Sequence, residues 1–180
     1  MLKAIIKTQI ARFERAYDYD MSYARDLLAT DLRAMLIFNR VMPLAQYRRD
    51  LPVDAWYAAK LVGAMSEDCG PCTQLVVRMA EQAGVPAQTL RAIVGRRPEQ
   101  LSAEAQLAYR FAEASLAHSL EADPLREEIL RRWGRRALVS IGFALVSARI
   151  FPTLKYALGY GKTCVRVEVG GQSQAVPQGA

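Results

Sequence analysis

The sequence predicts an all-α protein, and three observations support this class. Ala, Leu, Arg and Glu are abundant while aromatic residues make up only 8% of the chain, a composition that favours helix over sheet. Apolar residues recur at steps of three and four along most of the chain, as they do on one face of a helix. With 180 residues, 52% of them hydrophobic, the chain is long enough for one domain with a substantial core. We expect this single helical domain to span residues 1–169.

Residues 1–50 are expected to form an N-terminal layer of helices. The first helix spans residues 2–17, because its apolar side chains follow one another at helical steps: Ile6, Ile10, Phe13 and Tyr17. A second helix, capped by Asp20 or Ser22, carries the next apolar stripe. It has to end before Pro43, where a connector begins.

Two helices separated by a short break are expected in the middle of the chain, over residues 53–84. The first is rich in alanine and runs to Met65, after which Ser66-Glu67-Asp68 interrupts it. The second begins with Cys69-Gly70-Pro71-Cys72 and ends before Gly84, a residue typical of the position just after a helix. The proline fits the first turn of a helix, where its missing N–H has no helical partner.

The helical pattern continues through most of the second half of the chain. It covers residues 86–94, a segment capped by Ser102 and a segment that begins at Asp123. Residues 135–150 are apolar nearly all round, so we expect this helix to be fully buried. Pro152 is expected to kink or interrupt it.

The end of the chain departs from the helical pattern. Three valines alternate with polar residues over residues 164–169, which indicates a short strand. Residues 170–180 consist largely of Gly, Gln, Ser and Pro, and we expect them to form a disordered tail.

The chain is basic, with a formal net charge of +6 and a pI near 9.4. Its arginines cluster at residues 48–49, 96–97 and 131–136. Arginines near helix ends stabilise the last carbonyl groups and the helix dipole. The chain has no basic stripe with interleaved aromatic residues, which nucleic-acid binding would favour. We therefore interpret the clusters as helix-end residues and do not favour the remaining alternative, a basic helical protein that binds nucleic acid.

The sequence also predicts a cytoplasmic protein. Lys7 interrupts the apolar run at the N-terminus, which is not the pattern of a secretory signal. The longest apolar stretch, residues 137–148, is too short to span a bilayer, so no membrane is expected. In a reducing compartment, two closely spaced cysteines indicate redox or metal chemistry rather than a structural disulfide.

Cys69 and Cys72 are the strongest functional signal of the sequence. Residues i and i+3 lie on one face of a helix with Cβ atoms about 5–6 Å apart, so the two thiols can join with little backbone movement. The helix N-terminus lowers the pKa of a nearby thiol by about one unit. Zinc needs four ligands, and only His118 and Cys164 are left to complete the set, so we expect neither a metal nor a cofactor. Thioredoxins carry the same C-G-P-C tetrapeptide, but the βαβ pattern that they require is absent.

The helix, the break, the C-x-x-C pair and the following helix resemble those of the alkylhydroperoxidase D and carboxymuconolactone decarboxylase superfamily. The similarity covers residues 53–84 by motif, with Cys-Gly-Pro-Cys-Thr-Gln-Leu-Val-Val followed by Ala-Glu-Gln-Ala-Gly-Val. It implies a compact helical fold that assembles into trimers or hexamers. It also implies that Cys72 is oxidised to sulfenic acid by a peroxide, that Cys69 resolves it to a disulfide, and that a dithiol donor reduces the pair again.

Two positions differ from the proton relay of this family. Val76 stands where the relay histidine is expected, and Tyr57 stands where the relay glutamate is expected. We nominate Glu67 as a base for Cys69, because a carboxylate two residues away can take a thiol proton. Alternatively, Glu67 and Asp68 cap the helix. The single histidine of the chain could enter the relay or simply end its own helix.

The sequence therefore predicts a thiol-dependent oxidoreductase that reduces peroxides or disulfides through the dithiol of Cys69 and Cys72. The expected partners are a peroxide or disulfide substrate, a dithiol reductant and further copies of this chain in a homo-oligomer. The alternative is a helical member of the superfamily without redox turnover. Such a protein would bind a small molecule or serve as an oligomeric scaffold.

Overall fold

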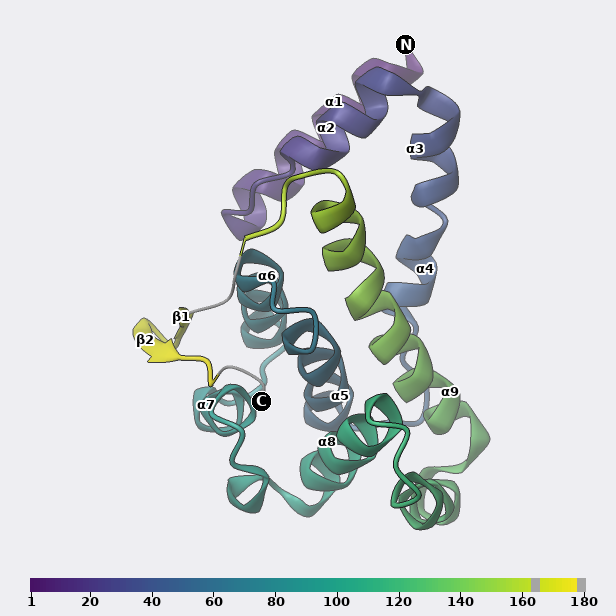
Figure 1. Cartoon of the computed structure of the whole chain (residues 1–180), viewed down its shortest axis with the longest axis vertical. Helices are drawn as coiled ribbons and strands as arrows, with labels where there is room; N and C mark the ends of the chain where they lie inside the picture. Colours follow the sequence, from purple (N-terminus) through teal and green to yellow (C-terminus); the bar gives the residue numbers. More distant parts are fainter. Residues whose placement is uncertain (163–165, 178–180) are drawn as a thin grey trace.

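The computed structural model describes residues 1–162 and 166–177 and confirms the all-α class. Within these ranges every element is helical except one two-stranded antiparallel sheet near the C-terminus. Figure 1 shows a body built around α5 (Val53–Met65) and a layer of N-terminal helices above it. The candidate site lies where these two parts meet.

Helix α5 forms the centre of the body, and all of its residues from Ala55 to Met65 are buried. The helices that follow it in the chain are α6 (Gly70–Gln82), α7 (Ala87–Val94), the 3-10 turn η1 (Pro98–Gln100), α8 (Ala103–Leu116) and α9 (Ala122–Ala157). The four α-helices among them, α6, α7, α8 and α9, all pack around α5. At Gly63 the backbone of α9 is so close that a Cβ atom would lie 3.0 Å from the carbonyl oxygen of Leu145.

The predicted end of α6 and the predicted start of α8 are confirmed. Helix α6 ends before Gly84, whose positive φ of 85° suits glycine, and the N–H of Val85 bonds back to the carbonyl of Ala80. Ser102 caps α8 by accepting a hydrogen bond from the N–H of Ala105. Local capping chemistry therefore decides these boundaries, which is why the sequence alone indicates them.

The N-terminal layer contains α1 (Leu2–Tyr17), α2 (Ser22–Thr30), α3 (Leu32–Phe38) and α4 (Val41–Gln46). The predicted bounds of α1 are confirmed, but the single second helix is wrong. Asp31 has extended backbone and its side chain accepts the N–H of Arg33, so it ends α2 and begins α3. The predicted connector begins only at residue 47 and runs to residue 52, because Pro43 lies in the first turn of α4, where proline is tolerated.

The layer has a small hydrophobic core of its own, separate from the core of the body. Its buried residues are Ile6, Ile10, Tyr19, Tyr23, Ala24, Leu28 and Met35. Three partly buried residues of the body, Leu75 on α6, Leu154 on α9 and Tyr160 after α9, pack against it. The layer therefore rests on α6, which begins at the cysteine pair, and on the end of α9.

Helix α9 combines two segments that join at Gly134, whose φ of 78° is outside the helical region. The helix then continues through Pro152 to Ala157, so the predicted interruption at this proline is wrong. The predicted full burial is wrong as well, because Val139 and Val146 are exposed. By length and composition alone α9 could cross a membrane, a test that core helices of soluble proteins also pass, and 44% of its most apolar window is buried here.

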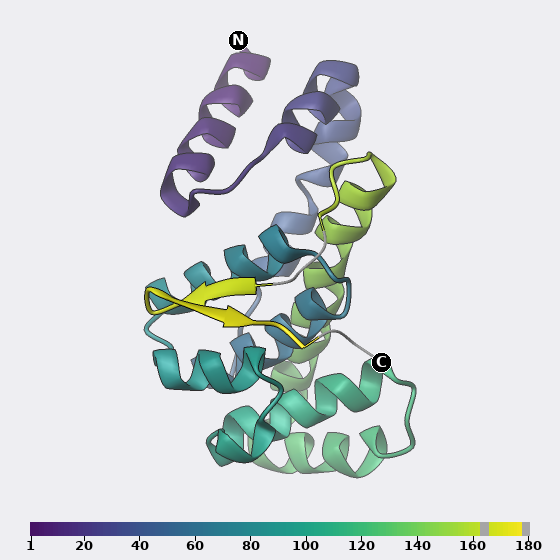
Figure 2. The same ribbon diagram turned by 60° about the vertical axis from the view of Figure 1, so that its left-hand side comes forward.

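The predicted short strand is present as β1 (Arg166–Val169), although its expected start at Cys164 lies outside the described residues. The predicted disordered tail is wrong for residues 170–175. Gly170 and Gly171 have positive φ and form the two-residue turn of a hairpin with β2 (Gln172–Ala175). Figure 2 shows this hairpin beside α6 and α7. It is ordered because Val167 and Val169 belong to the core of the body.

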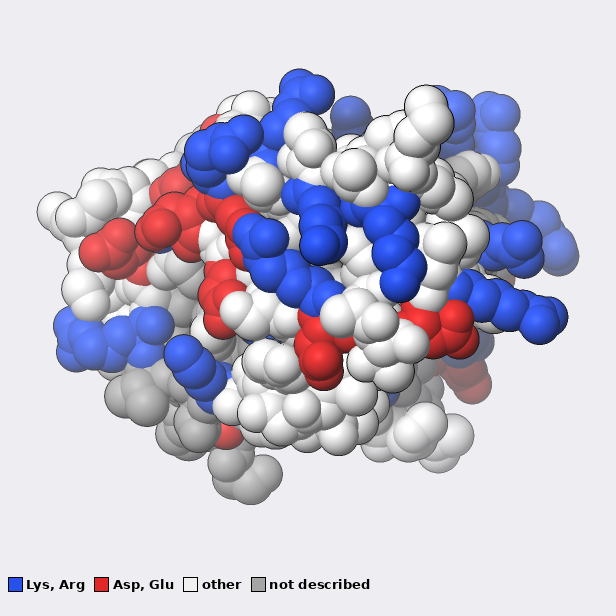
Figure 3. Space-filling model, turned by 90° about the horizontal axis from the view of Figure 1, so that it is seen from above, with Lys and Arg blue, Asp and Glu red and all other residues white. Residues whose placement is uncertain are grey.

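On the upper face, Figure 3 shows basic side chains interspersed with acidic and uncharged residues. The densest sequence cluster is largely paired within the chain. Arg131 and Arg132 both form ion pairs with Glu128, and Arg136 pairs with Asp50. Arg131, Arg132 and Arg136 lie on either side of the junction at Gly134, near which the sequence predicts a helix end.

Candidate active site

Cys69 and Cys72 lie at the N-terminus of α6, as the sequence predicts. Cys69 is the N-cap residue and Cys72 is the third residue of the helix. Their sulfur atoms form a disulfide, and their Cα atoms are 5.2 Å apart. The N–H of Thr73 bonds to the carbonyl of Cys69, which begins the helical ladder. The first turn of a helix presents N–H groups without helical partners, so a negative charge at Cys72 is favoured.

The break before the pair is fixed by the end of α9 and the segment after it. Tyr156 donates a hydrogen bond to the carbonyl of Asp68 at 2.8 Å. The N–H of Gly70 donates to the carbonyl of Lys162 at 3.0 Å. Asp68 itself has a positive φ of 49°, which turns the chain sharply between α5 and α6. The position of the disulfide therefore depends on contacts far away in the sequence.

Glu67 points toward α9. One carboxylate oxygen binds Arg149 and the other accepts a hydrogen bond from Thr153 at 3.0 Å. Cys69, rather than Glu67 or Asp68, occupies the N-cap position of α6. The role of Glu67 as a base for Cys69 stays a prediction, since its hydrogen bonds are directed to α9.

The structure brings a residue to Cys72 that the sequence analysis did not single out. The hydroxyl oxygen of Tyr19 lies 3.8 Å from the sulfur of Cys72. Tyr19 belongs to the segment between α1 and α2, and only 6% of it is exposed. Burial raises the pKa of its hydroxyl, so Tyr19 is a neutral hydrogen-bond donor over the physiological range.

A buried lysine lies behind this tyrosine. The ammonium of Lys155, near the end of α9, is 3.2 Å from the hydroxyl of Tyr19, and only 3% of the residue is exposed. It also lies 4.7 Å from the ring centre of Tyr19 and 5.5 Å from that of Tyr23. Burial lowers the pKa of Lys155, while the charge of Asp20 opposes this change and that of Lys162 adds to it.

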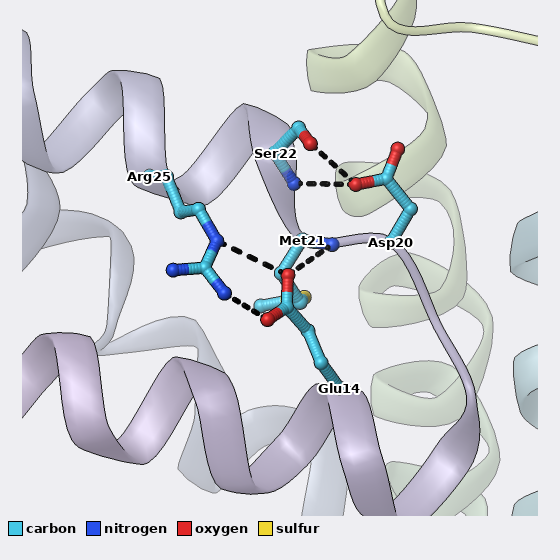
Figure 4. A network of polar contacts seen from close by, with 5 residues as sticks. All are labelled: Glu14, Asp20, Met21, Ser22 and Arg25. Atoms are coloured by element: carbon cyan, nitrogen blue, oxygen red, sulfur yellow. Dashed lines mark hydrogen bonds and ion pairs between the residues drawn. The ribbon is translucent and has the colours of Figure 1, made fainter.

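The segment that carries Tyr19 is held from both sides. Figure 4 shows that Glu14 binds Arg25 and accepts the N–H of Met21 at 3.2 Å, so α1 and α2 are tied across the turn. Asp20 accepts both the N–H and the hydroxyl of Ser22 at the start of α2. Met21, rather than Asp20 or Ser22, is the N-cap residue of α2, although Asp20 accepts the first N–H of the helix. These contacts limit how far Tyr19 can move.

Arg78 of α6 ties the same segment to the body. Its guanidinium donates to the carbonyl groups of Tyr17 and Asp18 and forms an ion pair with the carboxylate of Asp18. Asp18 has a positive φ of 44°, typical of a residue just after a helix. Because Arg78 and Cys72 lie on the same helix, this contact sets the position of Tyr19 relative to the sulfur.

The other sequence candidates lie elsewhere. Tyr57 and Val76, at the two relay positions of the resembling family, are both buried. Tyr57 packs edge-on against Trp56, with ring centres 4.9 Å apart. His118 is exposed and has a positive φ of 53° just beyond the end of α8, so it ends its helix rather than entering the body. Cys164 lies outside the described residues.

Tyr19 and Lys155 were missed because they are remote from the motif in sequence. Tyr19 precedes Cys72 by 53 residues and Lys155 follows Tyr19 by 136 residues. One signal was present in the sequence: Lys155 stands in an otherwise apolar helical segment, where a buried charge needs a specific partner. Only the tertiary packing of the N-terminal layer on α6 and α9 shows that this partner is Tyr19, which also contacts Cys72.

An open apolar groove of about 810 Å³ runs between α8 and α9. Phe111 and Leu116 of α8 line one side of it, and Leu145 and Val146 of α9 line the other. Arg149 and Thr153, the two residues that bind Glu67, also line the groove. The groove therefore approaches the break that precedes the disulfide.

Comparison with known proteins does not assign this arrangement to a family: no family model matches the chain, and no curated protein or solved structure is detectably similar to it.

Proposed function

We propose that this protein is a thiol-dependent oxidoreductase that reduces peroxides or disulfides through Cys69 and Cys72. One observation carries this proposal: the two sulfurs are bonded at the first turn of α6, and a buried hydroxyl lies 3.8 Å from one of them. A dithiol at a helix N-terminus is reactive because the helix favours the thiolate. The resemblance in residues 53–84 to the alkylhydroperoxidase D superfamily points to the same chemistry.

The reaction with a peroxide balances with the two cysteines alone. The Cys72 thiolate attacks one peroxide oxygen and the O–O bond breaks. The other oxygen takes up a proton from solvent, which balances the proton that Cys72 had released, and leaves as an alcohol or water. Cys72 is then a sulfenic acid. The thiol of Cys69 then attacks the sulfur of Cys72. The sulfenic hydroxyl leaves as water with the thiol proton of Cys69, and the disulfide forms. An external dithiol, oxidised to its own disulfide, returns both cysteines to thiols.

The geometry favours Cys72 over Cys69 as the attacking sulfur. Cys72 is 5% exposed and lies in the first turn of α6, whereas Cys69 is fully buried. Tyr19 contacts Cys72 as well. A helix terminus contributes up to about 2 kcal/mol for a partly buried charge, which corresponds to roughly one pKa unit or slightly more.

The proposal is tested with protein in which Cys164→Ser removes the third thiol. The reduced protein should lose two hydrogens on mild oxidation with hydrogen peroxide, as measured by intact mass. Cys69→Ser should stop at a sulfenic acid that dimedone traps, and Cys72→Ser should consume no peroxide in the presence of dithiothreitol. A reduced parent protein whose mass does not change with peroxide or with an oxidised dithiol would contradict the proposal.

The groove between α8 and α9 supports the second candidate function, the binding of a small apolar molecule without redox turnover. Its volume of about 810 Å³ falls within the range of ligand pockets. This function requires no thiol, so the double variant Cys69→Ser, Cys72→Ser separates the two candidates. Binding of an apolar fluorescent dye that Val146→Glu abolishes and the double variant retains, together with failure of the peroxide assay, would favour it.

A further inference from the structure

Three buried side chains from different elements form a chain of polar contacts that ends at Cys72. The ammonium of Lys155 lies 3.2 Å from the hydroxyl oxygen of Tyr19, which lies 3.8 Å from the Cys72 sulfur. All three residues are no more than 6% exposed. Because little water competes with these contacts, their electrostatic effect on the sulfur is stronger than it would be at the surface.

The chemistry of the two end groups fixes the direction of both hydrogen bonds. An ammonium group has donors only, so Lys155 donates to the hydroxyl oxygen of Tyr19. A disulfide sulfur carries no hydrogen, so the hydroxyl of Tyr19 is the hydrogen-bond donor in its contact with Cys72. Each donor therefore points toward the sulfur, an arrangement that favours negative charge on that atom.

The other groups that act on Lys155 leave this polarity in place. Asp20 is the acidic group that acts on it, but this carboxylate is occupied by the N–H and hydroxyl of Ser22. Lys162 adds a second positive charge, and the ring of Tyr23 lies 5.5 Å from the ammonium. One carboxylate and one further cation therefore act on Lys155 with opposite signs, and the direct contact of its ammonium is with the hydroxyl of Tyr19.

We propose that Tyr19 is a catalytic residue that donates a hydrogen bond to the Cys72 thiolate, and that Lys155 is the positioning residue that holds the hydroxyl in this role. The inference rests on the proposed dithiol function. It assigns a polar pair to the task of the relay histidine and glutamate of the resembling superfamily, at whose positions this chain has Val76 and Tyr57. The proton that Cys72 releases on ionisation goes to solvent, and both donors keep theirs.

The test measures the thiol pKa of Cys72 directly. Cys69→Ser and Cys164→Ser leave Cys72 as the only thiol, and its rate of alkylation by iodoacetamide is followed against pH. We expect a pKa below the ordinary value of about 8.5. Tyr19→Phe and Lys155→Met should each raise it by about one unit, which lowers the alkylation rate at pH 7 about tenfold. Lys155→Arg keeps the positive charge, so the pKa of Cys72 should rise less in this variant than in Lys155→Met.

Two matched controls remove the same chemical groups outside the site. Lys60→Met removes another buried ammonium, and Tyr109→Phe removes the hydroxyl of a buried tyrosine on α8. Both should leave the pKa of Cys72 unchanged. An unchanged pKa in Tyr19→Phe with native circular dichroism would overturn the inference. Because this variant keeps the aromatic ring, it decides the question even if Lys155→Met fails to fold.

The inference and the proposed function fail in different ways. If the parent protein consumes no peroxide and exchanges no disulfide, the proposed function fails, and the alkylation profile still shows whether Tyr19 and Lys155 act on Cys72. If turnover is normal but the profile of Tyr19→Phe matches that of the parent, the function stands and the inference fails.

Discussion

Two lysines are buried in this protein, and their surroundings differ in one decisive respect. Lys60 on α5 donates a hydrogen bond to the carbonyl of Ala45 at 2.7 Å and lies 4.3 Å from the ring centre of Trp56. Lys155 on α9 also lies over an aromatic ring, but it donates to the hydroxyl of Tyr19. Within residues 1–162 and 166–177, neither ammonium forms an ion pair with a carboxylate.

The acceptor determines what each buried charge can do. A backbone carbonyl only accepts hydrogen bonds, so it cannot relay the effect of the Lys60 charge to a third group. The contact between Lys60 and Ala45 therefore serves only to join α5 to α4. A hydroxyl is both acceptor and donor, so the charge of Lys155 polarises Tyr19 toward Cys72. The comparison shows how the same residue type is structural in one place and suited to chemistry in another.

The largest expected effect concerns stability and Lys60. Burial lowers its pKa from 10.5 to about 8. Between these values the unfolded chain binds one more proton than the folded protein, so stability rises with pH there and is lowest below pH 8. A shift of this size corresponds to about 3 kcal/mol. Lys60→Met should therefore be more stable than the parent at pH 7, by up to that amount less about 1 kcal/mol for the lost hydrogen bond.

Urea unfolding of both proteins at pH 7 and pH 10 checks this prediction. The advantage of Lys60→Met should shrink as the pH rises, because the parent then buries a neutral amine. Comparing the two proteins at each pH cancels the other groups that titrate in this range. An advantage that stays constant between pH 7 and pH 10 would show that Lys60 is not the source of the pH dependence.

The next effect concerns Arg78, which positions Tyr19 without touching the cysteine. Arg78→Met removes its hydrogen bonds to the carbonyl groups of Tyr17 and Asp18. We expect a loss of about 1–2 kcal/mol in the local stability of α1. Hydrogen exchange of the α1 amides measures this loss. The pKa of the Cys72 thiol should rise by less than it does in Tyr19→Phe.

Arg132→Met is the matched control for Arg78→Met. It removes a surface arginine that pairs with Glu128 on α9, far from Tyr19 in the sequence. We expect at most a few tenths of a kcal/mol and no change at Cys72. Equal effects of the two substitutions on the Cys72 pKa would mean that general charge, rather than the placement of Tyr19, controls the thiol.

The sequence was sufficient for the features that local chemistry decides. The bounds of α1, the break at Ser66-Glu67-Asp68 and the end of α6 at Gly84 follow from periodicity and capping residues. The position of Cys69 and Cys72 at the start of α6 follows from the same rules. Each of these features involves residues within one or two helical turns of each other.

Features decided by tertiary contacts were not predictable in this way. The strand β2 lacks a strong pattern of its own and is ordered because it pairs with β1, whose valines enter the core. Pro152 interrupts no helix because burial and packing around α9 outweigh the lost hydrogen bond. Tyr19 and Lys155 meet only because the N-terminal layer rests on α6 and α9.

The smallest expected effect decides between Glu67 and the pair of Tyr19 and Lys155 as the polar group that controls the thiols. A base role for Glu67 predicts that Glu67→Gln slows the peroxide oxidation of the dithiol tenfold or more. We expect less than a twofold change, because the Glu67 carboxylate is paired with Arg149 and its polar contacts are directed to α9. The lost ion pair should lower stability by no more than about 1 kcal/mol. Stopped-flow measurement of intrinsic fluorescence during oxidation gives the rate, and a tenfold decrease would restore Glu67 as the base and reduce Lys155 to a structural charge like Lys60.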